Sequence, residues 1–140
     1  MDSRAIIERV VDALLQEDAD AVAALYTEDG VVDFPLYPEP ARGREMIRAS
    51  QQRLFDMFSD LSVEVRSVLG GDGICAAEVV VRSTNTGPIE TPTGERIPAT
   101  GKQMQQRDVW VFDVTPEGLI SEERHYFDTT DAMRQLGLGA

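Results

Sequence analysis

The order of two hydrophobic patterns along the chain is the feature that most constrains its fold. Before residue 60, apolar residues recur at helical spacing over residues 3–15, 18–26 and 43–58. From residue 60 onwards, apolar and polar residues alternate instead, which is typical of strands that bury one face. Helices followed by a run of strands predict a mixed α+β domain.

The second part of the chain is expected to form an antiparallel meander of four long strands. These strands cover residues 60–69, 74–84, 103–114 and 119–127. A short strand is also expected at residues 31–34, between the second and third helices. Residues 87–101 contain three prolines and three glycines, which predicts a loop with a small hairpin around Pro92.

Short polar side chains mark where the helices are expected to begin. Asp2 or Ser3 precedes the first helix, Asp18 precedes the second, and Thr129 or Thr130 precedes a last short helix. Such side chains accept hydrogen bonds from the free backbone N–H groups of a first helical turn. They are therefore predicted to be N-caps.

Composition favours a single soluble domain over residues 1–140 and excludes several classes of partner. The net charge of −12 would repel nucleic acid and anionic membranes. The acidic residues near the N-terminus are unlike a signal peptide, and the single cysteine, Cys75, fits a reducing, cytoplasmic compartment. One His and one Cys do not make a zinc site, so neither a metal nor another cofactor is expected.

The alternation of side chains along the last two long strands brings together two groups with acid–base chemistry. Met104, Asp108, Trp110 and other even-numbered residues share the apolar face of residues 103–114, so Asp108 is expected inside the domain. His125, the only histidine, lies on the next strand. We expect an Asp108–His125 pair if both side chains face inward. The alternative is that His125 only satisfies a structural hydrogen bond.

Several segments resemble the SnoaL-like polyketide cyclases of the nuclear transport factor 2-like and ketosteroid isomerase-like superfamily. They are residues 18–30, the Pro-rich stretch leading to residues 43–47, residues 97–102, Asp108-Val-Trp-Val-Phe, Glu117-Gly-Leu-Ile and Tyr126-Phe-Asp. The resemblance implies a cone-shaped α+β barrel, in which a curved antiparallel sheet wraps around N-terminal helices and encloses an apolar pocket. It also implies a homodimer through the outer sheet face, with Val80, Arg82, Val109 and Val111 in the interface.

The resemblance carries over to individual positions only in part. The acid/base Asp of aldol-type cyclases matches His125, and the histidine that these cyclases have on the preceding strand matches Trp110. The carboxylic acid of the ketosteroid isomerase oxyanion hole matches Asp108. The isomerase base falls at Phe34 or one residue before it. The last Asp of the family signature matches Asp128, which the resemblance implies to be a helix cap.

The function expected from these residues is a polyketide-type cyclase that closes a ring by intramolecular aldol chemistry. His125, with an ordinary pKa near 6.5, would act as general base and then as acid. Asp108 would orient the imidazole or, if protonated, donate to a developing enolate oxygen. A small hydrophobic or polyketide-like ligand would be lined by Tyr26, Phe34, Asn85, Gln106, Trp110 and Phe127.

Two other functions remain open from the sequence. The same pocket could activate water in an epoxide hydrolase or a dehydratase-like lyase, with Gln106, Asn85 and Asp108 as the polar groups. The chain could also be a non-catalytic dimer that binds a small ligand.

Overall fold

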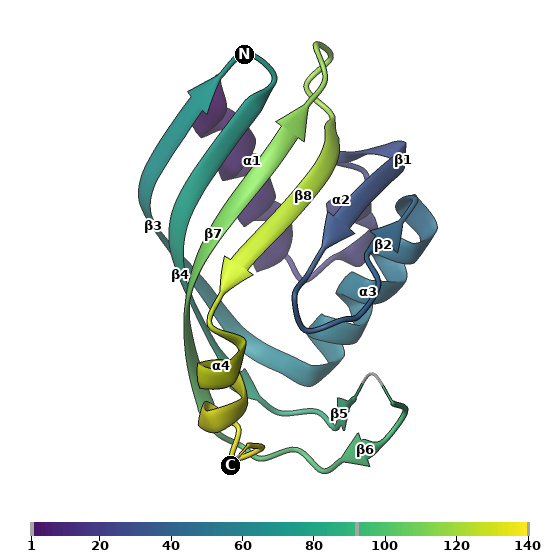
Figure 1. The fold of residues 1–140 in the computed structure, drawn as a ribbon, viewed down its shortest axis with the longest axis vertical. Coiled ribbons are helices and arrows are strands. Elements are labelled where there is room, and N and C mark those ends of the chain that lie inside the picture. The colour runs from purple at the N-terminus through teal and green to yellow at the C-terminus, as the bar shows by residue number, and fades with distance from the viewer. Residues whose placement is uncertain (1, 92, 140) are drawn as a thin grey trace.

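The structure is a computed structural model that describes residues 2–91 and 93–139 (Figure 1). It contains four α-helices among these residues: α1 (Ser3–Leu15), α2 (Ala19–Ala23), α3 (Arg44–Met57) and α4 (Thr129–Gln135). The main sheet has the strand order β2-β1-β8-β7-β4-β3. Its strands are β1 (Tyr26–Asp33), β2 (Ala41–Arg42), β3 (Phe58–Gly71), β4 (Ile74–Asn85), β7 (Gln103–Val114) and β8 (Ile120–Phe127). The α+β class is therefore confirmed.

The main sheet is strongly curved but open, which corrects the expected barrel (Figure 1). Strands β2 and β3 lie at opposite edges of the sheet and do not pair with each other. Strand β1 also pairs parallel with β8, so the sheet is not purely antiparallel. The helices α1 and α3 cover one face of the sheet instead of a closing strand pair, and the core lies between them and the sheet.

The first core cluster joins α1 to the long strands. Ile6, Ile7 and Val10 form the buried stripe of α1, at the spacing that an amphipathic helix requires. They pack with inward-facing side chains of β4 and β7, including Ala77 and Phe112. Because successive strand residues face opposite sides, this packing fixes which side chains of β4, β7 and β8 point into the domain.

Three of the helices begin at aspartate caps. Asp2, Asp18 and Asp128 each accept backbone hydrogen bonds from the first turn of the following helix. The cap of α4 is therefore Asp128 and not Thr129 or Thr130, which are already inside the helix. Strand β1 begins at Tyr26, so the second helix is shorter than the expected 18–26.

The loop after β4 contains the expected hairpin, formed by β5 (Ile89–Glu90) and β6 (Arg96–Ile97). Pro92, around which the hairpin was expected, lies outside the described residues. Ile89 packs with Met57, Met104 and Leu136 in a second apolar cluster, which attaches the hairpin to the body of the domain. None of the helices in the described part of the chain is long and apolar enough to cross a membrane.

Candidate functional site

Strands β7 and β8 place Asp108 and His125 on the same inner face. Across the two strands Trp110 is paired with His125 and Asp108 with Phe127, so Asp108 and His125 are diagonal neighbours. His125 Nδ1 lies 2.9 Å from Asp108 Oδ2. The structure therefore contains the expected contact, while its part in any reaction stays a prediction.

Asp108 is almost completely buried, and all its hydrogen bonds go to one oxygen. Besides the imidazole, Trp110 Nε1 donates to Oδ2 at 3.0 Å and Gln106 Nε2 donates at 3.5 Å. Three N–H groups around one oxygen suit an ionised carboxylate. Asp108 Oδ1 is buried without a hydrogen-bond partner among the described residues, so Asp108 keeps an unused acceptor.

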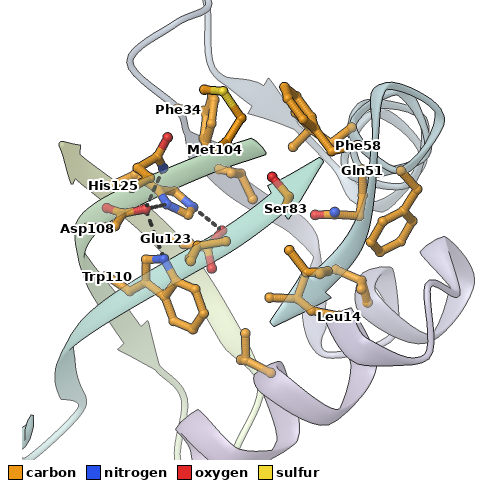
Figure 2. Close-up of a pocket in the computed structure, with 18 of the residues that line it drawn as sticks. Leu14, Phe34, Gln51, Phe58, Ser83, Met104, Asp108, Trp110, Glu123 and His125 are labelled. Atoms are coloured by element: carbon orange, nitrogen blue, oxygen red, sulfur yellow. Dashed lines mark hydrogen bonds and ion pairs between the residues drawn. The ribbon is translucent and has the colours of Figure 1, made fainter. Parts of the chain in front are cut away.

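Glu123 completes the site on the other side of the imidazole. Its Oε2 lies 3.0 Å from His125 Nε2, and the residue is 7% exposed. Glu123 is not among the site residues expected from the sequence. The available signal was parity, because residues 123 and 125 face the same side of a strand. The result is a row of three groups, Asp108, His125 and Glu123, which we call the acid–base row (Figure 2).

The acid–base row changes the protonation expected for His125. Burial alone lowers its pKa, but the charge of Glu123 and the hydrogen bonds that the ring donates to both carboxylates outweigh burial and raise the pKa of His125 to about 10. The ring is then an imidazolium at neutral pH, with an N–H for each carboxylate. A resting imidazolium is an acid, so the expectation that His125 first acts as a base does not fit this geometry.

Tyr26 lines the same cavity as Glu123. The side chain of Tyr26 is buried at the start of β1. Burial first, then the charge of Glu123 and a side-chain hydrogen bond with it, raise the pKa of Tyr26 above its ordinary value. Tyr26 therefore stays a neutral donor next to Glu123.

The acid–base row opens onto a cavity of about 160 Å³ between the sheet and the helices (Figure 2). Most of its walls are apolar side chains: Val10, Leu14, Val22, Val32, Phe34, Leu54, Phe55, Phe58, Leu61, Val81, Met104 and Trp110. Polar side chains come from Tyr26, Gln51, Ser83, Gln106, Asp108, Glu123 and His125. A mostly apolar cavity with few convergent polar groups is the usual form of a small-molecule site.

Four of the expected pocket residues line this cavity: Tyr26, Phe34, Gln106 and Trp110. Asn85 does not, because its side chain is completely buried in hydrogen bonds to Met57 O, Gly87 O and Thr100. Phe127 also lies outside the lining and packs on Phe34, with ring centroids 5.2 Å apart. Phe127 therefore supports a residue of the lining, whereas Asn85 is a structural anchor away from the ligand space.

A metal has no evident place in this site. Among residues 2–91 and 93–139, no group of three or more His, Cys, Asp or Glu side chains is arranged to hold a metal ion. Both nitrogens of His125 are already engaged by carboxylates. Cys75 is buried at the other end of β4 from Ser83 and does not line the cavity.

Residues 7–123 match the SnoaL-like domain, which is most of the chain. The chain belongs to the SnoaL-like domain family. The resemblance inferred from the sequence is thereby confirmed, and the matched region includes β7 with Asp108 and ends at Glu123. None of the curated proteins matches the sequence.

Solved structures of other proteins share the fold at low sequence identity. A candidate SnoaL-like polyketide cyclase from Jannaschia sp. CCS1 aligns with a TM-score of 0.82 and 19% identity, over 99% of this chain and 93% of that one. A protein with a ketosteroid isomerase-like fold from Catenulispora acidiphila, in complex with trimethylamine, aligns with a TM-score of 0.80 and 16% identity, over 98% and 95%. An epoxide hydrolase of the LEH-like type from Mycobacterium tuberculosis aligns with a TM-score of 0.69 and 21% identity, over 96% of this chain and 89% of that one.

Proposed function

We propose that this SnoaL-like protein is a small-molecule enzyme that moves protons next to a carbonyl group, as in the ring closure of a polyketide-type cyclase. The observation that carries the proposal is the acid–base row on the wall of an apolar cavity. A carboxylate, an imidazolium and a second carboxylate in contact can both take up and give back a proton. A binding site for an apolar ligand has no need of such a costly buried group of charges.

Exposure divides the roles within the acid–base row. The side chains of His125 and Glu123 are 12% and 9% exposed, whereas that of Asp108 is 2% exposed. Glu123 therefore accepts the proton from the substrate, and His125 donates to the oxygen that becomes negative. Asp108 holds the imidazolium in place from behind, assisted by Trp110.

An aldol ring closure then proceeds without net loss or gain of atoms. Glu123 removes a proton from the carbon next to a carbonyl and becomes neutral, which weakens its hydrogen bond from His125 Nε2. The Nε2–H can then turn to the enolate oxygen and stabilise it, while Nδ1–H stays on Asp108. The enolate carbon attacks a second carbonyl of the same molecule, and the new alkoxide takes the proton held by Glu123, which regenerates the carboxylate. Positioned acid–base groups typically accelerate a reaction by about 10²–10⁴-fold. Holding the flexible substrate in a folded shape accelerates ring closure further, because it brings the two reacting carbons together.

Water activation is the second candidate, because a cation between two carboxylates provides both a base and an acid for opening an epoxide. The LEH-like epoxide hydrolase from Mycobacterium tuberculosis shares the fold, which supports this candidate. In that reaction Glu123 would take the proton from water while His125 donates to the epoxide oxygen. A non-catalytic ligand-binding role is the third candidate.

Proton exchange tests the leading proposal without knowledge of the natural substrate. In D₂O, the wild-type protein should accelerate exchange of the acetyl protons of 4′-methylacetophenone, measured by proton NMR. Glu123→Gln and His125→Gln should each lower this rate by about 10²-fold or more. Gln52→Leu is the matched control, because Gln52 is exposed on α3 and outside the cavity lining. Exchange by Glu123→Gln at the wild-type rate would contradict the proposal.

Labelled water separates the two enzymatic candidates. With 4-methylstyrene oxide in water containing oxygen-18, an epoxide hydrolase produces a diol that carries the label. The leading proposal predicts exchange of the ketone protons and no enzyme-dependent diol. Binding of the ketone with neither reaction would support the non-catalytic role.

A further inference from the structure

Two polar side chains of the cavity lining stand apart from the acid–base row. Gln51 comes from α3 and Ser83 from β4, and both are half-buried. Their neighbours in the lining are apolar, among them Leu54, Phe58 and Val81. No hydrogen bond of either side chain is formed within the described part of the chain, whereas the polar groups of the acid–base row are paired with one another. Gln51 and Ser83 therefore have free donors and acceptors.

Strand register separates Ser83 from Asp108 along the sheet. In the β4–β7 ladder, Ser83 is paired with Met104 and Val79 with Asp108. Four residues along a strand correspond to roughly 13 Å. Figure 2 shows the Ser83 hydroxyl and the Gln51 amide on the other side of the pocket from Asp108 and His125. One cavity thus has two groups of polar side chains, the acid–base row with Gln106 bound to it, and Gln51 with Ser83.

The size of the cavity limits what can occupy both ends. A dry engineered cavity of about 150 Å³ accepts a molecule the size of benzene. The cavity here, about 160 Å³, is therefore suited to a ligand about one ring in size. Such a ligand touches both ends only if it is elongated.

We propose that Gln51 and Ser83 bind a second oxygen of the substrate, so that the substrate class is a small, one-ring-sized molecule oxygenated at both ends. This inference rests on the proposed function only in taking the cavity as the substrate site. A carbonyl or hydroxyl at the remote end satisfies the amide and the hydroxyl, whereas a methyl group there leaves both unpaired. Sites built to hydrogen-bond a polar group reject analogues that lack it. Gln51 and Ser83 are therefore specificity-determining residues, outside the acid–base row.

Two probes of the same shape test this inference by binding alone. 4′-Hydroxyacetophenone and 4′-methylacetophenone differ only in a hydroxyl or methyl group at the end remote from the ketone. Titration calorimetry on the wild-type protein should show the hydroxyl compound binding roughly 3–10-fold more tightly. In an end without hydrogen-bond partners the preference is opposite, because the methyl group is the more easily buried. Equal affinities, or tighter binding of the methyl compound, would overturn the inference.

Variants then assign the preference to these residues. In Gln51→Leu/Ser83→Ala the methyl compound should bind more tightly than the hydroxyl compound, and Ser83→Ala alone should reduce the wild-type preference. Gln52→Leu, one residue along α3 and exposed, should keep it. An unchanged preference in Ser83→Ala and in the double variant would also overturn the inference.

The outcome is separable from that of the proposed function. Preference for the hydroxyl compound without acetyl-proton exchange would support the remote oxygen site and contradict the acid–base chemistry. Acetyl-proton exchange without a preference for the hydroxyl compound would support the acid–base chemistry and contradict the remote oxygen site. Binding of neither probe would contradict the inference, because it would exclude one-ring ketones from the cavity.

Discussion

At the scale of single residues, the central feature is a histidine whose two ring nitrogens both contact carboxylates. Parity along two strands, together with the family resemblance, predicted that Asp108 and His125 meet if His125 faces inward, as it does. The same parity placed Glu123 inward, but a glutamate between Ser121 and His125 has no distinguishing sequence pattern. Its role became visible only with the direction of the imidazole, which depends on packing against Phe34 and Trp110.

The acid–base row makes folding stability depend on pH in a specific window. The pKa of His125 is raised to about 10 in the folded state, against about 6.5 when unfolded. The folded state therefore holds a proton that the unfolded state has lost, so this contribution is complete below pH 6.5 and disappears as pH rises towards 10. Over that range, the wild-type free energy of unfolding in urea should fall by an amount on the order of a few kcal/mol more than that of His125→Gln. Parallel curves for the two proteins would contradict a raised pKa.

At the scale of elements, Asn85 shows why a polar residue at a strand end is hard to interpret from sequence. Such a position suits a pocket residue as well as a structural anchor. In the fold, its amide donates to Met57 O and Gly87 O, and its carbonyl oxygen accepts from Thr100 N and Oγ1. It therefore ties the end of α3 to the loop that follows β4. The four long strands were predicted closely, because alternation and turn residues are local signals.

Replacing Asn85 should damage the fold and leave ligand recognition intact. Asn85→Ala leaves several buried backbone groups unpaired, which should lower the free energy of unfolding by about 2–4 kcal/mol. Thermal unfolding followed by circular dichroism measures this loss. Gln52→Ala, which removes only an exposed hydrogen bond to Asp56, should be within about 0.5 kcal/mol of wild type. Below its melting temperature, Asn85→Ala should bind 4′-hydroxyacetophenone with the wild-type affinity. A weaker affinity would contradict the prediction, because it would indicate that Asn85 contacts the ligand.

At the scale of the whole molecule, the closed barrel was the expectation that failed. Closure depends on whether the first and last strands in space meet, and here they do not. Sequence alternation specifies which face of a strand is buried but not which strands become neighbours, so the parallel β1–β8 pairing was also missed. The outer sheet face carries half-buried Val109 and Val111, whereas Val80 is 1% exposed and adds no free surface.

We predict that this outer face mediates a homodimer. Sedimentation velocity should give twice the chain mass of 15.4 kDa for wild type. Val109→Arg should dissociate the dimer, because it introduces a buried charge without a partner. Leu69→Arg is the control, since Leu69 is 68% exposed near the β3–β4 turn and should leave the dimer intact. A wild-type monomer at micromolar concentration would contradict the prediction.

The protonation of His125 tests the account of the site most directly. Because the chain has a single histidine, its ring nitrogens give one set of signals in a nitrogen-15 NMR spectrum. At pH 7 both nitrogens should carry protons, and this pattern should persist to about pH 10. A neutral imidazole at pH 7, or a titration midpoint near 6.5, would contradict an imidazolium held between Asp108 and Glu123.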